Sequence, residues 1–411
     1  MRTIKLIIYV VSVIIFIGCR ESGNPVSGFP YDIPEDYLAE NVNIPSFWLT
    51  TTKEVEEYIK DNVKKGEWEE LGKSAGGRPI YGVTYGTPRS GKGTSTYSGA
   101  SSVKNIGAYR GPDNGRKVYM AIAAVHGFEV EGIVGIINMI SVFETGKDLD
   151  GKEWPELESM LDSIDRIVLV PICNPDGRDR VPIRMEKFRG HGKDAKHVHE
   201  YLNTGGRDGG KLIGWPDCKE YVPMPFDKFE FPGSYPNDNG YNLMHDNFFG
   251  EMQPENKIIC SLAEREKPDI ILNMHTGLPR NNYFISILKP TSGAYPILLE
   301  KVWRDFYREV NTELTLKGLR KTDNVQKEST PPTKVNGTGS INLTSVLAFH
   351  CGALSVTVED GSHGFTGVYD DGTPVDHTPY KILNSELSLH EAAMRFLYRR
   401  GGVQQWEINY K

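Results

Sequence analysis

The segment VYMAIAAVHGFE, residues 118–129, decides the fold class of this chain. Its first eight residues, Val118 to Val125, are all apolar, and apolar side chains then recur at helical spacing from Ile133 to Phe143. This order predicts a buried strand, a tight turn at Gly127 and a helix. A strand without polar alternation is buried on both faces, which is typical of parallel or mixed sheets.

Similar patterns continue along the chain. Further strands are predicted at 79–85, 167–172, 270–274 and 353–358, and helical spacing is found at 52–63, 295–313 and 385–399. Buried strands that alternate with helices predict an α/β fold, with a central mixed, mostly parallel sheet and helices on both faces.

Polar side chains follow three of these apolar runs. His126 and Glu129 follow the first, and His275 follows the run at 270–274. Sites in open α/β sheets form at the carboxyl ends of strands, so we expect these side chains to meet. Two imidazoles and one carboxylate leave a tetrahedral zinc ion with an open position for water, which is the catalytic form of such a site. The sequence therefore predicts one Zn²⁺.

Glu359 ends the run at 353–358 and is the predicted general base. A water on zinc needs a group that takes its proton and later delivers it to the leaving group, and a carboxylate at a partly buried strand end suits this work. Asp360 is the alternative base. In the non-catalytic interpretation, Glu359 only stabilises the turn at Asp360 and Gly361.

Five motifs occur in an order that resembles the zinc carboxypeptidases, over roughly residues 50–365. They are LGKSAGGRPI (71–80), HGFE (126–129), PICNPDG (171–177), His275 and Glu359. The resemblance implies a zinc-carboxypeptidase-like fold, zinc at His126, Glu129 and His275, and Glu359 as base. It also implies that Arg189, fifteen residues after Asn174, steadies the scissile carbonyl and its oxyanion.

The chain departs from this family in the segment GYNLMHDNF, residues 240–248. The family uses an Asn-Arg pair here to hold the terminal carboxylate of its substrate, but Met244 and His245 stand in the two places. Histidine lacks the planar fork of arginine, so we expect altered carboxylate recognition. His245 and Asn242 are candidate substrate-binding residues, and Asn242 is alternatively a hydrogen-bond partner of a zinc histidine. The family's tyrosine is also missing from residues 334–338.

The N-terminal residues have the pattern of a lipoprotein signal peptide, predicted for residues 1–18. Arg2 and Lys5 flank an apolar run that ends at Gly18, and Cys19 would then be acylated. An uncleaved anchor helix is the alternative. Residues 19–45 are rich in Gly, Pro and polar side chains and predict a tether. The protein is therefore expected outside the cytoplasm, anchored by lipid to a bacterial membrane.

A single catalytic domain is predicted for residues 46–411, with a long insertion at about 190–241 that is rich in Gly, Pro and Asp. The net charge is -7, and the 47 basic and 54 acidic residues are well mixed, so no basic stripe indicates a nucleic-acid partner. Cys173, Cys218, Cys260 and Cys351 are compatible with disulfides or with buried thiols.

These features favour a zinc-dependent hydrolase of amide bonds in peptides or peptidoglycan-derived substrates. A zinc deacylase or esterase of the aspartoacylase type is one alternative, although NPDG and residues 71–78 favour the peptidase. The other is a non-catalytic lipoprotein that binds peptide or glycan. Such a protein has no need of a general base, so Glu359 argues against it.

Overall fold

The computed structural model describes residues 31–411 apart from 32, 92, 95, 188–194, 215–217, 219–222, 278–285, 290–296, 320–340, 365, 369–371, 373 and 411. Residues 31–411 form one compact unit. The predicted signal peptide, Cys19, Arg189 and the segment 334–338 lie outside the described residues. Among the residues described, no helix has the length and apolar character needed to cross a membrane.

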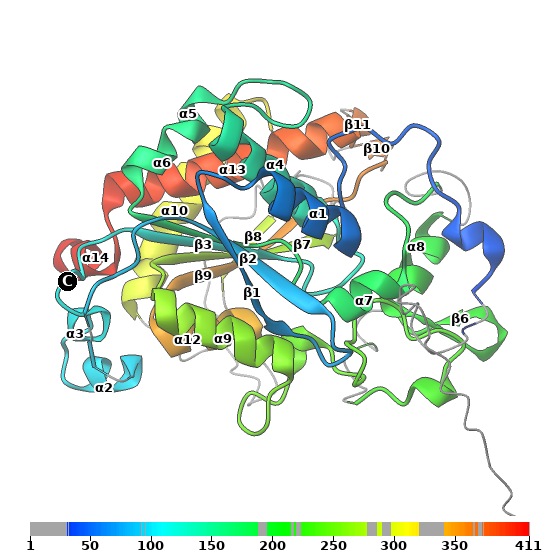
Figure 1. Ribbon diagram of the computed structural model, residues 1–411, viewed down its shortest axis with the longest axis horizontal. Helices are drawn as coiled ribbons and strands as arrows, with labels where there is room; N and C mark the ends of the chain where they lie inside the picture. Colours follow the sequence, from blue (N-terminus) through cyan, green and yellow to red (C-terminus); the bar gives the residue numbers. More distant parts are fainter. Residues whose placement is uncertain are drawn as a thin grey trace, which may run out of the picture. The chain divides into compact units, whose positions relative to one another are not determined.

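A seven-stranded sheet forms the centre of this unit (Figure 1). Its four central strands are parallel, and antiparallel strands extend it at both edges. In spatial order the strands are β1 (Glu67–Lys73), β2 (Pro79–Gly86), β4 (Arg166–Val170), β3 (Val118–Ala123), β7 (Ile270–Gly277), β9 (Leu354–Gly361) and β8 (Ser286–Leu288). The predicted mixed, mostly parallel sheet is confirmed.

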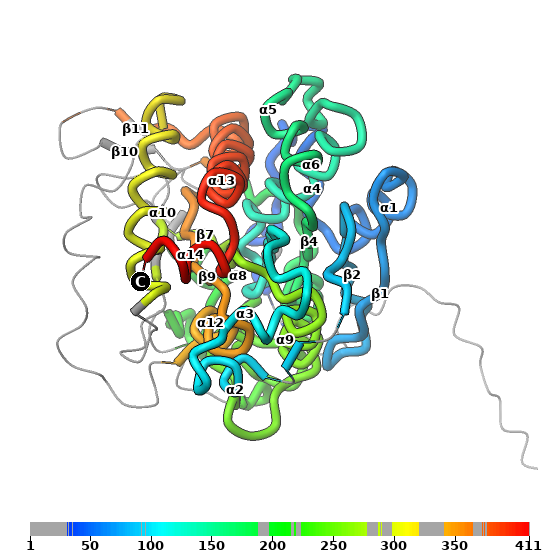
Figure 2. Tube along the Cα trace, turned by 90° about the vertical axis from the view of Figure 1, so that its left-hand side faces the viewer, coloured from blue at the N-terminus to red at the C-terminus, as the bar shows by residue number. Residues whose placement is uncertain are grey.

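Helices cover both faces of the sheet, as predicted, because the side chains of the central strands alternate between two apolar cores. Tyr119 and Ala121 of β3 face one core, and Met120 and Ile122 face the other. The first core lies under α4 (Glu131–Thr145), α10 (Ile297–Leu316) and α13 (Pro379–Arg400). The second lies under α9 (Pro254–Glu266) and α12 (Leu343–Cys351). Figure 2 shows α10 running beside α13.

The helix predicted near residue 52 is α1 (Thr52–Asn62), and Thr51 caps it in a capping box with Glu54. The other elements are short. They are α2 (Tyr97–Ser102), α3 (Gly107–Arg110), α5 (Pro155–Glu158), α6 (Met160–Ser163), α7 (Pro175–Arg180), α8 (Ala195–Thr204), α14 (Val403–Asn409), β5 (Gly206–Arg207), β6 (Lys211–Leu212), β10 (Thr366–Val368), β11 (Pro374–Asp376), η1 (Glu35–Leu38), η2 (Asp208–Gly210), η4 (Phe226–Lys228) and η5 (Leu243–His245).

Residues 31–45 pack against the domain, so the prediction of a tether up to residue 45 is wrong for this part. The Tyr31 ring meets Phe231 edge to face, with centroids 5.5 Å apart, and Tyr37 meets Tyr201 in the same way at 5.2 Å. The backbone N–H of Asn41 donates to the Met185 carbonyl at 2.8 Å. Aromatic contacts thus attach this segment to the insertion, and a backbone hydrogen bond attaches it to the chain just before the insertion.

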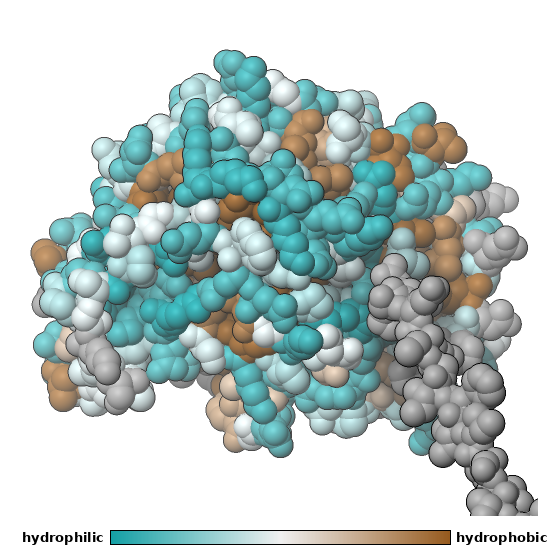
Figure 3. Space-filling view, viewed as in Figure 1, coloured by the Kyte–Doolittle hydropathy of each residue, from teal (hydrophilic) through white to brown (hydrophobic). Residues whose placement is uncertain are grey.

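The insertion itself has more regular structure than its composition indicates. It contains α8, the β5–β6 pair and η4, and its last part is hydrogen-bonded to the turn after β3. The backbone N–H of Ser234 donates to the Asn203 carbonyl at 2.9 Å, which ties that last part to the end of α8. All four described cysteines are buried free thiols. The surface in Figure 3 is mainly hydrophilic, with small separate hydrophobic areas.

Candidate metal centre

The turn between β3 and α4 brings His126 and Glu129 to one point. Gly127 is essential to its shape, because a Cβ there would lie 2.2 Å from the backbone nitrogen of Arg178. The insertion holds the same turn from the other side. Ser234 accepts the Gly127 N–H with its carbonyl and the Phe128 N–H with its hydroxyl, both at 3.0 Å. The backbone is therefore fixed on both sides of the two side chains.

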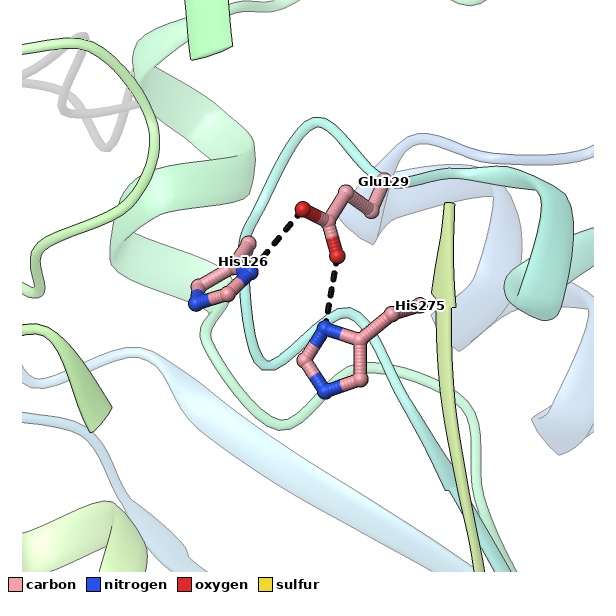
Figure 4. A group of neighbouring side chains, drawn as sticks. All are labelled: His126, Glu129 and His275. Carbon is pink, nitrogen blue, oxygen red and sulfur yellow. Dashed lines mark hydrogen bonds and ion pairs between the residues drawn. The ribbon is translucent and has the colours of Figure 1, made fainter. Parts of the chain in front are cut away.

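The three predicted zinc ligands lie together in the structure (Figure 4). Glu129 Oε1 is 2.9 Å from His126 Nδ1, and Glu129 Oε2 is 2.7 Å from His275 Nδ1. One potential ligand atom from each residue falls within 4.8 Å of the others, and all three residues are buried. A buried group of two imidazole nitrogens and one carboxylate is the donor set of a catalytic zinc site.

The charges in this group suit a cation. Burial lowers the pKa of His126, so its imidazole tends to be neutral, as a metal ligand must be. Burial opposes ionisation of Glu129, but the two imidazoles outweigh it and hold the Glu129 pKa well below its usual range. For His275, burial is outweighed by the Glu129 carboxylate, and the pKa is raised. A metal ion would replace the proton that His275 shares with this carboxylate.

Asn242 orients one of the ligands. Its Oδ1 atom lies 3.2 Å from His126 Nε2 and also accepts the backbone N–H of Met244 at 3.0 Å. With Oδ1 as acceptor, the His126 proton resides on Nε2, and the Nδ1 lone pair remains available for a metal. This hydrogen bond is the alternative role that the sequence offered for Asn242.

A family comparison agrees with this site. The family model described as "Zinc carboxypeptidase" matches residues 52–286, which is more than half of the chain. The chain belongs to the zinc carboxypeptidase family. It is thus a metallocarboxypeptidase-like hydrolase, and His126, Glu129 and His275 form its zinc site.

Solved carboxypeptidase structures share the fold. One is the metallo-carboxypeptidase from Pseudomonas aeruginosa in complex with (2-guanidinoethylmercapto)succinic acid, with 14% identity and a TM-score of 0.50 over 84% of this chain and 68% of that chain. The structure of a putative carboxypeptidase A from Shewanella denitrificans has 14% identity and a TM-score of 0.50, over 85% of this chain and 69% of that chain. No curated protein sequence matches the chain.

Glu359 lies beyond the stretch that the family model matches, so its place in the zinc carboxypeptidase site depends on the fold. It pairs with His275 across β7 and β9. Burial lowers the pKa of His275, but Glu129 and, to a smaller extent, the charge of Glu359 raise it. Asp360, the alternative base, is buried on the opposite face of the strand, where the Ser385 hydroxyl of α13 donates to it at 3.2 Å. The fold therefore puts Glu359, and not Asp360, beside the zinc ligands.

Met244 and His245, the residues expected from the sequence in place of the family's carboxylate-binding pair, lie on η5. Met244 is buried in the core under α9 and α12, and the Asn273 amide donates to its sulfur at 3.3 Å. His245 is partly buried. A thioether within an apolar core has no N–H or O–H group to donate to a carboxylate, as an asparagine amide has.

Two of the sequence motifs have a structural role that sequence reasoning did not assign. The Arg78 guanidinium of LGKSAGGRPI lies 2.7 Å from the Asp176 carboxylate of NPDG and 2.7 Å from Asp238 at the end of the insertion. In the same network, Asn174 Nδ2 donates to the Tyr235 carbonyl at 3.1 Å. The two motifs therefore fasten the end of the insertion to the turn that carries the zinc ligands.

Sequence reasoning also missed Tyr235. Its ring stacks on the His126 ring with centroids 3.6 Å apart and an interplanar angle of 6°. Burial, and then the negative charges of Glu129 and Glu359 among others, raises the pKa of Tyr235 well above its usual value. A tyrosine in a Gly- and Pro-rich segment gives no signal of a site in the sequence, because only the tertiary fold brings it to the metal centre.

Proposed function

We propose that this protein is an extracytoplasmic, lipid-anchored zinc peptidase that hydrolyses amide bonds in peptides or peptidoglycan-derived substrates. The observation that carries the proposal is the juxtaposition of His126, Glu129 and His275 with Glu359, at the carboxyl ends of neighbouring parallel strands. A metal-binding protein without catalysis needs the first three residues but not the fourth.

The residues have separate roles in this proposal. Zinc, when bound, supplies a Lewis acid that polarises the scissile carbonyl and makes water more acidic. Glu359 takes the proton of the attacking water and delivers it to the leaving amine. Arg189 keeps its proposed role as donor to the developing oxyanion, on the basis of the family resemblance.

Substrate recognition is proposed to differ from that of an ordinary carboxypeptidase. The buried Met244 supports this, because it cannot replace the amide of the family's Asn-Arg pair. His245 remains the proposed contact for an anionic group, and it binds a carboxylate only while protonated. Blocking the C-terminus of a peptide should therefore reduce its rate of hydrolysis less with this protein than with an enzyme that carries the complete Asn-Arg pair.

The proposed location rests on the sequence alone. The apolar run that ends at Gly18 and Cys19 supports cleavage before Cys19 and acylation of its thiol. Metabolic labelling with a radioactive fatty acid should label the wild-type protein and not Cys19→Ser. An unlabelled wild-type protein would refute the anchor.

The catalytic proposal is tested with the soluble domain that starts at Tyr31. We expect it to contain one zinc ion and to hydrolyse members of a library of free, amidated and peptidoglycan-stem peptides, with loss of activity in a chelator. Acylated amino acids are assayed beside the peptides. Hydrolysis of the acylated amino acids alone would favour the deacylase, and zinc without any turnover would favour the binding protein.

Glu359→Gln should reduce turnover by about 100- to 10,000-fold, because it removes the general base. Its zinc content should equal that of the wild-type domain, since the three ligands are intact. Metal analysis and initial rates on the best peptide measure both quantities. Unchanged hydrolysis by this variant would refute the role of Glu359.

A further inference from the structure

Tyr235 contacts the metal centre through its aromatic face. The ring lies parallel to the His126 imidazole, and the 3.6 Å separation of their centroids is full van der Waals contact. The same His126 ring is held at its edge by Asn242. The imidazole is therefore prevented from tilting by Tyr235 and from rotating in its plane by Asn242.

Tyr235 also lies close to the second ligand of the turn. Burial and then the negative charge of Glu129 raise the pKa of Tyr235, so the phenol stays protonated beside this carboxylate. A phenol O–H that donates to a carboxylate fixes the direction of the carboxylate oxygens. One tyrosine is thus placed to act on both zinc ligands that the β3–α4 turn provides.

The insertion holds Tyr235 firmly in this place. The backbone N–H of Tyr235 donates to the Asn203 carbonyl at 3.1 Å, and its carbonyl accepts the Asn174 amide. The ring belongs to a small apolar cluster of insertion residues: Ile213, Cys218, Met224, Phe226 and Tyr235. Tyr235 is only 8% exposed. Its position is therefore set by the insertion together with Asn174, the N-cap of α7.

We propose that Tyr235 is a positioning residue of the zinc site, through which the insertion sets the orientation of His126 and Glu129 and hence the zinc affinity. This inference rests on the proposed function only in so far as zinc occupies this site. Partners that orient metal ligands commonly contribute about 10- to 100-fold to metal affinity. The insertion is then part of the metal centre and not an appendage of the domain.

The test is the zinc dissociation constant of the domain that starts at Tyr31, measured by competition with a chromogenic chelator. Tyr235→Phe keeps the stacked ring and removes the hydroxyl, and we expect zinc binding to weaken about 10-fold or more. Tyr235→Leu also removes the aromatic face and should weaken it further. Tyr241→Phe is the matched control. Tyr241 lies in the same segment, but it stabilises that segment through hydrogen bonds of its backbone with Asn237, so removal of its hydroxyl should leave zinc binding unchanged.

Thermal unfolding of the metal-free variants separates zinc binding from folding. We expect Tyr235→Phe to unfold at the wild-type temperature, and its cobalt-substituted form to show a shifted visible spectrum, since Glu129 is oriented differently. If Tyr235→Phe fails to fold, Met224→Ala is measured in its place. Met224→Ala loosens the apolar cluster behind the Tyr235 ring without changing a zinc ligand, and we expect this variant to weaken zinc binding as well.

A wild-type zinc dissociation constant in Tyr235→Phe, or in a folded Met224→Ala that has to stand in for it, would overturn the proposal. Because no substrate enters this measurement, a domain that binds zinc but hydrolyses no peptide would refute the proposed function and leave the result for Tyr235 valid.

Discussion

Gly127 illustrates how much a single residue decides at this site. It lies between His126 and Phe128 in the sequence. Its α-carbon faces the backbone of Gly177 and Arg178 in α7. Only a residue without a side chain allows the ligand turn to approach this helix so closely. The HGFE motif therefore contains a packing requirement as well as two zinc ligands.

Gly127→Ala should destabilise the domain by about 1–3 kcal/mol, because its Cβ would overlap backbone atoms that cannot move independently. Zinc binding should weaken at the same time, since the turn must shift. Urea unfolding and chelator competition measure the two effects. Gly115→Ala is the control, because a Cβ at Gly115 meets no atom within 4 Å. Equal stability of the two variants would contradict this account of the turn.

Among the elements, the loop before β2, helix α7 and the end of the insertion meet at the Arg78 guanidinium. Arg78 joins Asp176 of α7 to Asp238, and Asp179 adds a third carboxylate at 2.8 Å. Asp176 is fully buried, so its charge requires a partner. The resulting network keeps Ser234 and Tyr235 against the ligand turn.

Arg78→Met should therefore cost roughly 3–5 kcal/mol of stability, since it leaves a buried carboxylate without its cation. Zinc affinity should fall as well. The measurements are chemical unfolding and zinc titration. Lys53→Met is a suitable comparison, because the Lys53–Glu57 pair is solvent-exposed and should contribute no more than about 0.5 kcal/mol. An equally small change in the free energy of unfolding of Arg78→Met would show that the Arg78 network does not stabilise the domain.

At the scale of the whole molecule, the folded unit begins at Tyr31, before the expected domain start at residue 46. Tyr31, Tyr37 and Leu38 are partly buried against the first core. Their removal would expose Phe231 and Tyr201 to water. Apolar contacts of this kind stabilise a domain in proportion to the area they bury.

A truncated protein that begins at Ser46 should therefore unfold at a lower temperature than one that begins at Tyr31. Burial of an aromatic side chain is worth about 1.5–3 kcal/mol when complete, so two partly buried tyrosines should account for a few kcal/mol. Differential scanning calorimetry of the two proteins checks this. Identical transitions would mean that residues 31–45 contribute nothing to stability.

The two edges of the sheet show where sequence reasoning is weakest. The central strands were predicted because they are buried on both faces and read as continuous apolar runs. β1 was not predicted, since its residues are mostly exposed and charged, and β8 has only three residues. Edge strands form because a neighbour offers hydrogen bonds, and a single sequence does not contain that information.

The sequence by itself determined the α/β class, the zinc ligands and the candidate base, because burial patterns and donor chemistry are properties of local segments. Tertiary structure alone decided that Asp360 faces α13, that Met244 enters the core and that Tyr235 stacks on His126. These facts depend on which segments meet in space. At the metal centre such segments lie far apart in the sequence: His126 and Asn242 are 116 positions apart, and Arg78 and Asp238 are 160 positions apart.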